Sequence, residues 1–496
     1  MKAGTRNILA GAAVFAALSI ISVQTPAQQR LASGQGGPGG TIEEAAGTTD
    51  GGVVGGTDGA PGATGPGGTG PGGATAAGGS AATGGGGNAS RFECAAGKNG
   101  GNTDKGVSGN KIRLASTHVL SGPGSSFLGS SHVGMEAVIS NVNSQGGICG
   151  RLLELTLRDD GWDAPLGAQF IQNFINQDYF ALPVVPSSEG LTQAIKSKYI
   201  LNGKMPVVGT DGMLKEQYQD PYVWPVATAT VSTMRIMAKH AYDAGARQFG
   251  IVYDSRYKFG KEGARAFKDF VEGMPGARVD AYLGIQPGQP SYPDAETFNN
   301  KCGSSKRCEF VAMLLEPGTA ISWINSMGDD SHGRRLGFGS KGTGGAQPLF
   351  NAKFARDCGE PCNGMLLWTG YNPPIGEKQN LPAVAKYVND VRAIDPGVDV
   401  NNQFLEGAYL GMTVFVEALK KLGPNVTRAG LKQVMDSLSY QSDLSSPLTF
   451  APGKHYANLG AQAFAVRTAA GSFSGFADAG TGFIRDPDPG KFPSGD

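Results

Sequence analysis

The segment from residue 116 to residue 163 constrains the fold of this chain more than any other stretch. A predicted strand at residues 112–116 leads through a Ser-Gly-Pro-Gly loop into a helix, whose apolar side chains recur at positions i, i+3, i+4 and i+7. A Gly-Gly turn then precedes a second apolar segment, at residues 152–157. Strand, helix and strand at this spacing form a βαβ unit, so we expect a parallel sheet that binds ligands at the carboxyl ends of its strands.

The same alternation of strand and helix continues along the chain. Strands are predicted at residues 111–116, 152–158, 181–186, 206–210, 248–253, 278–284, 309–314, 335–339, 364–369, 447–450 and 461–467. Helices are predicted at residues 127–145, 164–177, 190–202, 230–245, 260–273, 319–327, 381–394, 404–421 and 427–437. Two such series followed by a return segment predict two lobes with several crossovers between them.

Five short pieces of this sequence, taken together, resemble one protein family. They are SGP from Ser121, NSQGGICGR from Asn143, LELTLRDD from Leu153, PVVPSSEGLTQA from Pro183 and QFGIVYDSRYKFG from Gln248. The combination is similar to the branched-chain amino-acid (Leu/Ile/Val) binding proteins, which are type I periplasmic solute-binding proteins of ABC importers. The resemblance covers residues 107–467. It implies an α/β fold of two Rossmann-like lobes, whose mostly parallel sheets are joined by a multi-strand hinge.

The resemblance also implies where each lobe begins and ends. Lobe one is expected at residues 107–228 plus 363–442, and lobe two at residues 229–362 plus 443–470. The last residues, 471–496, are rich in Gly, Asp and Pro and are expected to form an extended tail.

The N-terminal part of the chain does not have the composition of a folded domain. Residues 1–27 combine a basic start, an apolar run and a small-residue cleavage site, which predicts an export signal peptide. A retained membrane anchor is the alternative, since the apolar run is only slightly short for a bilayer span. Residues 28–106 are mostly Gly with Ala, Thr and Pro, which predicts a disordered linker. Such a linker acts either as a tether or as a tail without a mechanical role.

The cysteine content bears on the compartment. Six cysteines favour an oxidising environment, so we expect an exported protein, in the periplasm or at the cell surface. Nearness in sequence, with the two remaining cysteines left to join each other, predicts three disulfides: Cys302–Cys308, Cys358–Cys362 and Cys94–Cys149. A zinc site built from the two close pairs is the alternative, although the C-x5-C and C-x3-C spacings are poor for zinc.

Two loops of lobe one carry candidate ligand contacts. Ser187 and Ser188 follow an apolar strand and precede a helix, whose free N–H groups favour an anion. The resemblance implies that this loop holds the α-carboxylate of a ligand, whereas helix capping is the structural alternative. Thr210 and Asp211 end the next strand. The resemblance implies ligand contacts there too, and Asp211 either faces an ammonium group or caps a helical turn. Trp162 either walls the cleft or covers the lobe.

Lobe two offers further candidates. The resemblance implies an aromatic side chain against the body of the ligand, and Tyr257 and Phe259 stand at that place, with a core role as the alternative. Glu316 occupies the next strand-end loop. Lys341 stands where relatives that bind branched-chain amino acids carry an acid. Either the ligand is therefore not a simple aliphatic amino acid, or Asp211 or Glu316 supplies the missing charge, unless Lys341 is merely a surface residue.

The chemistry of the chain points to binding and not to catalysis. The five histidines are scattered, and no G-x-S-x-G, H-E-x-x-H or Walker pattern occurs, so we expect no enzyme activity, cofactor or metal. Lys and Arg together number 42, as do Asp and Glu, which gives no electrostatic reason to expect nucleic acid. The prediction is an extracytoplasmic, monomeric protein that captures a small amino acid, amide or carboxylate between its lobes. It would deliver this ligand to the membrane subunits of an ABC importer, and a membrane-tethered ligand sensor is the alternative.

Overall fold

The computed structural model describes residues 94, 98–302, 308–329 and 337–494. The predicted signal peptide at 1–27 lies outside the described residues, as does most of the predicted linker at 28–106. The described residues belong to one compact unit that extends from Gly86 to Asp496. None of the helices among them is both long enough and apolar enough to cross a membrane.

The first half of this unit contains a parallel sheet with the strand order β2-β1-β3-β4-β5, in which a single bridge between Leu114 and Ala181 joins β1 to β3. The strands are β1 (Lys111–His118), β2 (Leu152–Asp159), β3 (Leu182–Pro183), β4 (Val207–Val208) and β5 (Val223–Trp224). The connecting helices are α2 (Ser125–Leu128), α3 (Ser131–Ser144), α4 (Ala164–Asn176), α5 (Ser188–Lys196), α6 (Tyr199–Gly203) and α7 (Lys215–Gln219).

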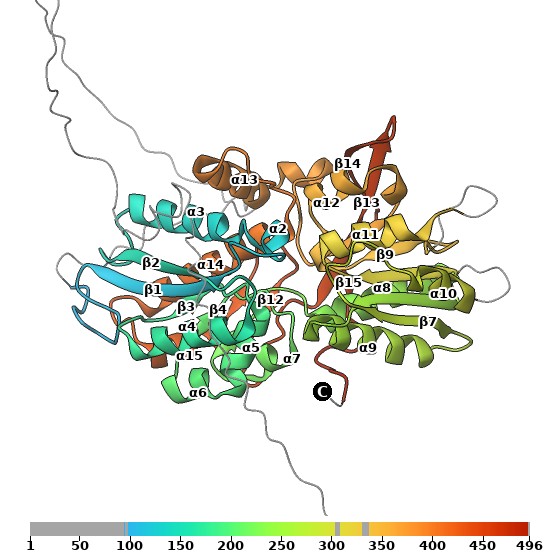
Figure 1. Cartoon of the computed structure of the whole chain (residues 1–496). Coiled ribbons are helices and arrows are strands. Elements are labelled where there is room, and N and C mark those ends of the chain that lie inside the picture. The colour runs from blue at the N-terminus through green and yellow to red at the C-terminus, as the bar shows by residue number, and fades with distance from the viewer. Residues whose placement is uncertain (1–93, 95–97, 303–307, 330–336, 495–496) are drawn as a thin grey trace, which may run out of the picture. The chain divides into compact units, whose positions relative to one another are not determined.

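A later part of the chain returns to this half and completes it, so that α3 packs against both α13 and α14 (Figure 1). The returning elements are η3 (Gly376–Asn380), α13 (Pro382–Ile394), α14 (Gln403–Leu422), α15 (Arg428–Met435), β11 (Ser439–Tyr440) and β12 (Leu448–Thr449). One apolar core contains residues of β1, α3, α14 and the segment after α15, which fixes the return segment in lobe one.

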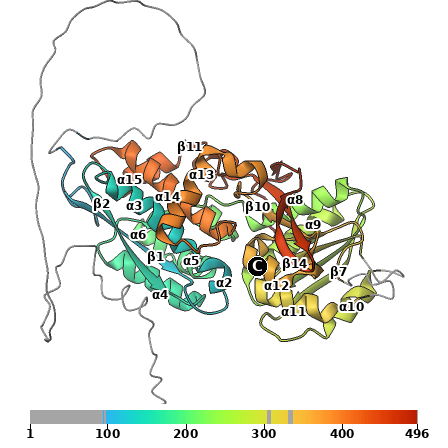
Figure 2. The same ribbon diagram turned by 90° about the horizontal axis from the view of Figure 1, so that it is seen from above.

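The second half contains a larger sheet with the order β7-β6-β8-β9-β10-β13-β14, and β15 also pairs with β13. Strands β7, β10 and β14 of this sheet are labelled in Figure 2. Its parallel strands are β6 (Gln248–Asp254), β7 (Arg278–Ile285), β8 (Phe310–Leu314), β9 (Thr343–Gly345) and β10 (Leu366–Thr369). The antiparallel strands are β13 (Gly460–Ala469), β14 (Ser472–Asp478) and β15 (Ile484–Arg485). The helices are α8 (Thr230–Asp243), α9 (Lys258–Glu272), α10 (Asp294–Lys301), α11 (Pro317–Met327), η1 (Gln347–Leu349), α12 (Ala352–Cys358) and η2 (Glu360–Cys362).

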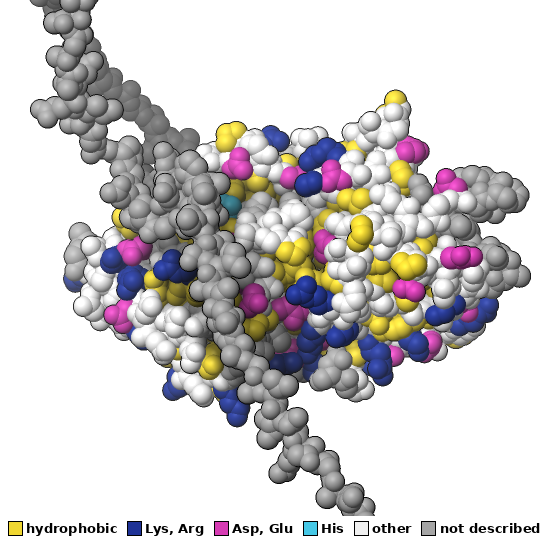
Figure 3. Space-filling model, viewed as in Figure 1, with side chains coloured by type: hydrophobic (Ala, Val, Ile, Leu, Met, Phe, Trp, Pro, Cys, Tyr) yellow, Lys and Arg dark blue, Asp and Glu magenta, His cyan; other side chains and the backbone are white. Residues whose placement is uncertain are grey.

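Helix α9 shows how the sequence sets this packing. Its buried side carries Phe259, Gly263 and Phe267, spaced four residues apart, which places them on one face of the helix. Its exposed side carries charged pairs at i and i+4, among them Arg265 with Asp269. Acidic and basic side chains both occur on the face of the molecule seen in Figure 3.

Three crossovers join the two halves, and Asn458 ties them together. Its side-chain amide donates hydrogen bonds to the carbonyl of Val226 in the first crossover, at 3.2 Å, and of Gly370 in the second, at 3.1 Å. The hydroxyl of Thr228 donates to the carbonyl of Gly460, at 2.6 Å. A Cβ atom at Gly370 would lie 2.4 Å from the hydroxyl of Thr228, so only glycine permits this close approach.

The structure differs from the sequence-based prediction at several places. The helix predicted at 127–145 is interrupted, because the chain forms α2 and then restarts as α3. The strand predicted at 335–339 lies partly outside the described residues, and a turn occupies residues 337–338, while the strand β9 forms later, at 343–345. Strand β10 pairs within the lobe-two sheet, so the second crossover comes a few residues after the predicted boundary at 362–363.

Residues 471–496, expected as an extended tail, contribute β14 and β15 to the lobe-two sheet. Asp486 forms a buried ion pair with Arg235 of α8, in which the Nε–Oδ1 distance is 2.8 Å. Sequence patterns are local and could not reveal this partner, which lies 251 residues away.

All three predicted disulfides are present: Cys94–Cys149, Cys302–Cys308 and Cys358–Cys362. The four cysteines of the two close pairs are therefore joined in pairs and do not form the alternative zinc site. Among the described residues, no group of three or more His, Cys, Asp or Glu side chains is placed to hold a metal ion.

Candidate functional site

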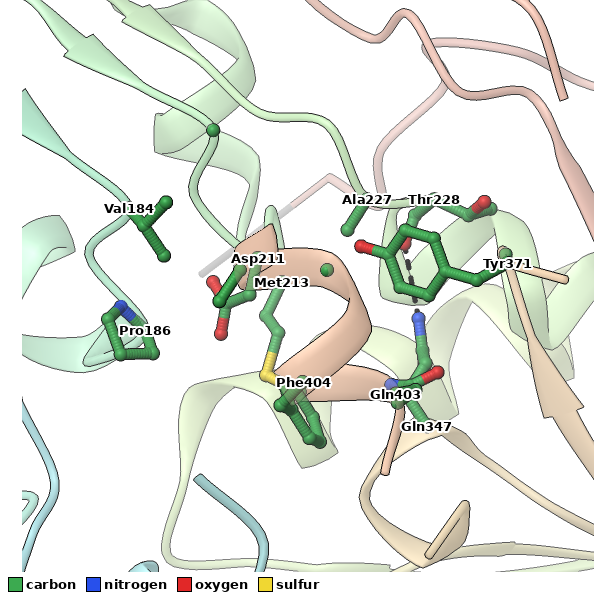
Figure 4. A pocket seen from close by; sticks show the side chains of 14 residues that line it. Val184, Pro186, Asp211, Met213, Ala227, Thr228, Gln347, Tyr371, Gln403 and Phe404 are labelled. Carbon is green, nitrogen blue, oxygen red and sulfur yellow. Dashed lines mark hydrogen bonds between the residues drawn. The ribbon is translucent and has the colours of Figure 1, made fainter. Parts of the chain in front are cut away.

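A pocket lies where the carboxyl ends of β3 and β4 meet two of the crossovers and the start of α14 (Figure 4). The space left free in this arrangement of the lobes is about 20 Å³, room for about one water molecule. Its lining is mostly apolar and is formed by Val184, Pro186, Gly209, Asp211, Met213, Ala227, Thr228, Gln347, Gly370, Tyr371, Gln403, Phe404, Gly407 and Ala408. Asp211 comes from lobe one and Gln347 from lobe two, so both halves contribute polar groups to one small space.

Asp211 is the charged residue of this lining, and it is held by neighbouring hydroxyl groups. The hydroxyl of Ser188 lies 2.7 Å from Oδ1 and 2.8 Å from Oδ2 of Asp211. The hydroxyl of Thr210 lies 3.2 Å from Oδ1. Burial raises the pKa of the Asp211 carboxyl to about 7, while hydrogen bonds from Ser188, Thr210 and the backbone of Met213 oppose this rise. The pocket therefore contains a carboxyl group that titrates near neutral pH.

One of the two serines that were expected to bind an anion is already engaged within the chain. Ser188 donates to Asp211, and its carbonyl accepts a hydrogen bond from the side chain of Gln217, at 3.2 Å. Ser187 is fully buried, and its hydroxyl group has no hydrogen-bond partner among the described residues. Neither serine lines the pocket.

The opposite wall carries polar groups that the sequence analysis did not identify. The side-chain amide nitrogen of Gln347 donates to the carbonyl of Thr228, at 3.1 Å (dashed in Figure 4), and to the hydroxyl of Thr233, at 3.0 Å. Its Oε1 atom is buried without a hydrogen-bond partner, as is Oε1 of Gln403 at the start of α14. Gln347 directly follows β9, so the rule that ligands bind at strand ends would have found it if this strand had been predicted correctly.

The predicted aromatic residues lie next to the pocket and not in its lining. Tyr257 stacks on Trp162 of lobe one with 4.1 Å between ring centroids, and Phe259 lies 6.2 Å from the same ring. Phe127 contacts both Trp162 and Phe404, each at 5.4 Å. Because Phe404 does line the pocket, this aromatic cluster connects the pocket wall with the contact between the lobes.

Polar contacts accompany this aromatic contact between the lobes. The backbone N–H of Lys258 in lobe two donates to Oε1 of Glu189 in lobe one, at 2.8 Å. The ammonium group of Lys258 also pairs with Glu216 of α7, at 2.6 Å. These contacts and the stacked rings hold the two halves together next to the pocket.

Glu316 and Lys341 lie elsewhere. Glu316 caps α11 by accepting hydrogen bonds from the N–H groups of Gly318 and Thr319, and it lines a different, larger and more open cavity of about 530 Å³. Lys341 pairs with Glu309, at 2.8 Å, and its side chain is 43% exposed. The structure thus brings Ser188, Thr210 and Asp211 together, and it places Glu316 and Lys341 outside the pocket.

Comparisons with known proteins were made for the whole chain. A family model described as periplasmic binding protein matches residues 111–471. A fatty acid ABC transporter substrate-binding protein from Thermomonospora curvata is 19% identical, with a TM-score of 0.62 over 77% of this chain and 94% of that one. A solute-binding protein of an ABC transporter from R. palustris, in complex with 4-hydroxybenzoate, is 14% identical, with a TM-score of 0.63 over 76% and 98%. A periplasmic binding protein type 1 from Bordetella pertussis Tohama I is 15% identical, with a TM-score of 0.61 over 74% and 100%. No curated protein matches the sequence.

Proposed function

We propose that this chain, which belongs to the periplasmic binding protein family, captures a small polar ligand in the pocket around Asp211 and delivers it to the membrane subunits of an ABC importer. The resemblance read from the sequence is confirmed, as is the α/β fold of type I periplasmic binding proteins. Members of this family are solute-binding proteins and not enzymes, and they work outside the cytoplasm. The three disulfides agree with such a compartment.

One observation supports the proposal most directly: both lobes contribute polar groups to one enclosed pocket beside the hinge. Asp211 follows a strand of lobe one, and Gln347 follows a strand of lobe two. A ligand that touches both binds the closed arrangement more tightly than the open one, and this difference in affinity is what drives closure. The closed form is in turn the one in which a binding protein of this kind would present its ligand to the membrane subunits of the importer.

The roles of the individual residues follow from their positions. Asp211 and Gln347 would contact the ligand, while Ser188 and Thr210 hold the Asp211 carboxylate in place. Trp162 and Tyr257 would close over the ligand, since they stack across the two lobes beside the pocket wall. We propose no ligand contact for Lys341, because its ammonium group is engaged by Glu309 away from the pocket.

A thermal-shift screen of the exported chain tests this function. Amino acids, amides, amines and carboxylates would be screened, and at least one compound is expected to raise the melting temperature, since ligand at about 100 times Kd stabilises the folded state by about 2.7 kcal/mol. The variant Ala227→Leu fills part of the pocket and should abolish the shift, while Lys341→Ala should retain it. If a compound still raises the melting temperature of the Ala227→Leu variant, it binds elsewhere, and that result would contradict the proposal.

A further inference from the structure

We infer that the ligand presents N–H donors to Asp211 and Gln347, as an amine or an amide does, and that this pocket does not take the carboxylate implied by the family resemblance. The inference rests on the proposed function and narrows it to a chemical class. Four observations about the pocket carry it.

Two hydroxyl groups of the strand-end loops, where the resemblance implied a ligand carboxylate, already have acceptors within the chain. Ser188 directs its hydroxyl group at Asp211, and the backbone of Met213 supports the same carboxylate. The hydroxyl of Thr210 lies between the carbonyl of Val185, at 3.0 Å, and Oδ1 of Asp211, at 3.2 Å. Asp211 thus occupies the place of a bound anion. A ligand carboxylate would bring a second negative charge close to the first in a space with little water, where like charges repel strongly.

The acceptor on the opposite wall is fixed by geometry. A carbonyl oxygen can only accept, so the end of the Gln347 side chain that faces the carbonyl of Thr228 must be the NH₂ group. The other end is therefore the oxygen, which is buried without a partner although Gln347 is only 5% exposed. A buried acceptor without a donor is costly, and a ligand N–H group would relieve that cost.

Gln403 adds a second polar group to the same space. Its residue is 4% exposed, it lines the pocket, and its Oε1 atom has no hydrogen-bond partner. Unlike Gln347, its amide is not fixed by a neighbouring carbonyl, so it can turn to suit the ligand. Gln403 comes from α14, so polar groups reach the pocket from three separate parts of the fold.

No cationic side chain among the described residues lines this pocket, so none offsets the charge of Asp211 there. The nearby carboxylate of Glu189 makes the surroundings more negative still, and it adds to the rise in the pKa of Asp211. The remaining lining is formed by apolar side chains such as Val184, Met213 and Phe404. Once the lobes part to admit a ligand, this lining suits one with a small apolar body and a donor head group, and a charged amine matches it best.

Two matched sets of probes test the inference on the intact exported chain. One set is 3-methylbutylamine, 3-methylbutanamide and 3-methylbutanoate, and the other is benzylamine, benzamide and benzoate. Within each set only the polar group changes, so differences in affinity report on that group alone. Calorimetry should show that the amine or amide of at least one set binds at least about tenfold more tightly than the matching carboxylate, the factor expected for one charge-assisted hydrogen bond.

The variant Asp211→Asn keeps the shape and removes the charge. It should weaken amine binding by at least about tenfold, change amide binding less, and improve carboxylate binding. Lys341→Ala is the matched control and should leave all six affinities unchanged, because Lys341 lies outside the pocket. If Asp211→Asn does not fold, the comparison within each set on the unaltered chain decides the question.

The outcomes separate this inference from the function on which it rests. A carboxylate that binds as tightly as its amine, and loses that binding in Ala227→Leu, would overturn the donor assignment and leave solute capture standing. If none of the six probes binds, both the ligand class and the assignment of this pocket are overturned.

Discussion

The hydroxyl group of Ser188 lies within 2.8 Å of both carboxylate oxygens of Asp211, so two strand-end loops of lobe one are joined at the wall of the pocket. The contact has two consequences. It commits a hydroxyl group that would otherwise be free for a ligand, and it favours the ionised form of Asp211 against the effect of burial. The pocket therefore contains a carboxyl group that is held in position and whose charge depends on pH.

Amine binding is expected to strengthen as the pH rises through 7. The pKa of the Asp211 carboxyl is raised to about 7, so this group is protonated and neutral below that pH and ionised above it. Only the ionised form attracts a cation. The affinity for 3-methylbutylamine, measured by calorimetry from about pH 5.5 to about pH 8.5, should rise by up to about tenfold per pH unit and then level off. The matching amide serves as the control, and an equally steep profile for it would contradict the role of Asp211.

Ser188→Ala should shift this profile toward higher pH. The hydrogen bond from Ser188 lowers the pKa of Asp211, so its loss leaves the effect of burial less opposed and raises that pKa further. The midpoint of the amine-binding profile is the quantity to measure. Ser437→Ala, in an exposed position after α15, is the control and should not move it. An unchanged midpoint in Ser188→Ala would show that the hydroxyl does not stabilise the ionised carboxylate.

Tyr257→Ala should weaken ligand binding, although it leaves the polar groups that line the pocket in place. Tyr257 stacks on Trp162 across the two lobes, and an aromatic pair contributes about 0.5–1.5 kcal/mol beyond the area that it buries. Loss of the pair destabilises the closed form, so we expect a roughly tenfold rise in Kd and a larger radius of gyration in solution scattering. Tyr242→Ala removes a tyrosine that packs on Arg247 within lobe two, and it should change neither quantity. Equal effects in both variants would argue against a closing role.

Asn458→Ala should destabilise the hinge. The change leaves the buried carbonyl groups of Val226 and Gly370 without the donor that joins them. Two lost hydrogen bonds predict a fall in the free energy of unfolding of about 2 kcal/mol, measurable by urea denaturation. Asn363→Ala, which removes only an exposed side-chain contact with Glu360, should cost far less. A loss no greater than that of the control would show that the crossovers hold together without Asn458.

Asp486→Ala should be among the most destabilising single changes in the C-terminal segment. It leaves the buried guanidinium group of Arg235 without its carboxylate, and breaking a buried pair in this way costs about 3–5 kcal/mol. The double variant Arg235→Met with Asp486→Leu removes both charges and should recover much of the loss. Asp488→Ala changes a more exposed acid nearby and should have little effect. Normal stability of Asp486→Ala would mean that the segment after β14 is not part of the folded unit.

The sequence alone predicted the fold class and most of the long elements. The βαβ segment appears as β1, α3 and β2, because the periods of apolar residues in helices and strands are local properties that survive folding. The three disulfides also followed from spacing alone. The strand predicted at 335–339 does not form among the described residues, and β9 forms instead at 343–345. A three-residue strand rich in Gly has almost no apolar period to detect, so Gln347, which comes after it, was not recognised as a strand-end residue.

The candidate site, like the fold, was predicted only in part from the sequence. The sequence and the family resemblance named Ser188, Thr210 and Asp211 on two strand-end loops. The structure brings them together because β3 and β4 are neighbouring parallel strands, whose carboxyl ends meet at one edge of a sheet. The sequence could not predict which hydrogen-bond donors are free for a ligand and which are already bonded within the chain, because that depends on side-chain contacts between loops. Only the tertiary structure shows that Ser188 donates to Asp211 and that Lys341 pairs with Glu309. It also shows that Gln347 and Asp486 have partners more than 100 residues away in the sequence. The physical reason is that hydrogen bonds and charge pairs form between neighbours in space.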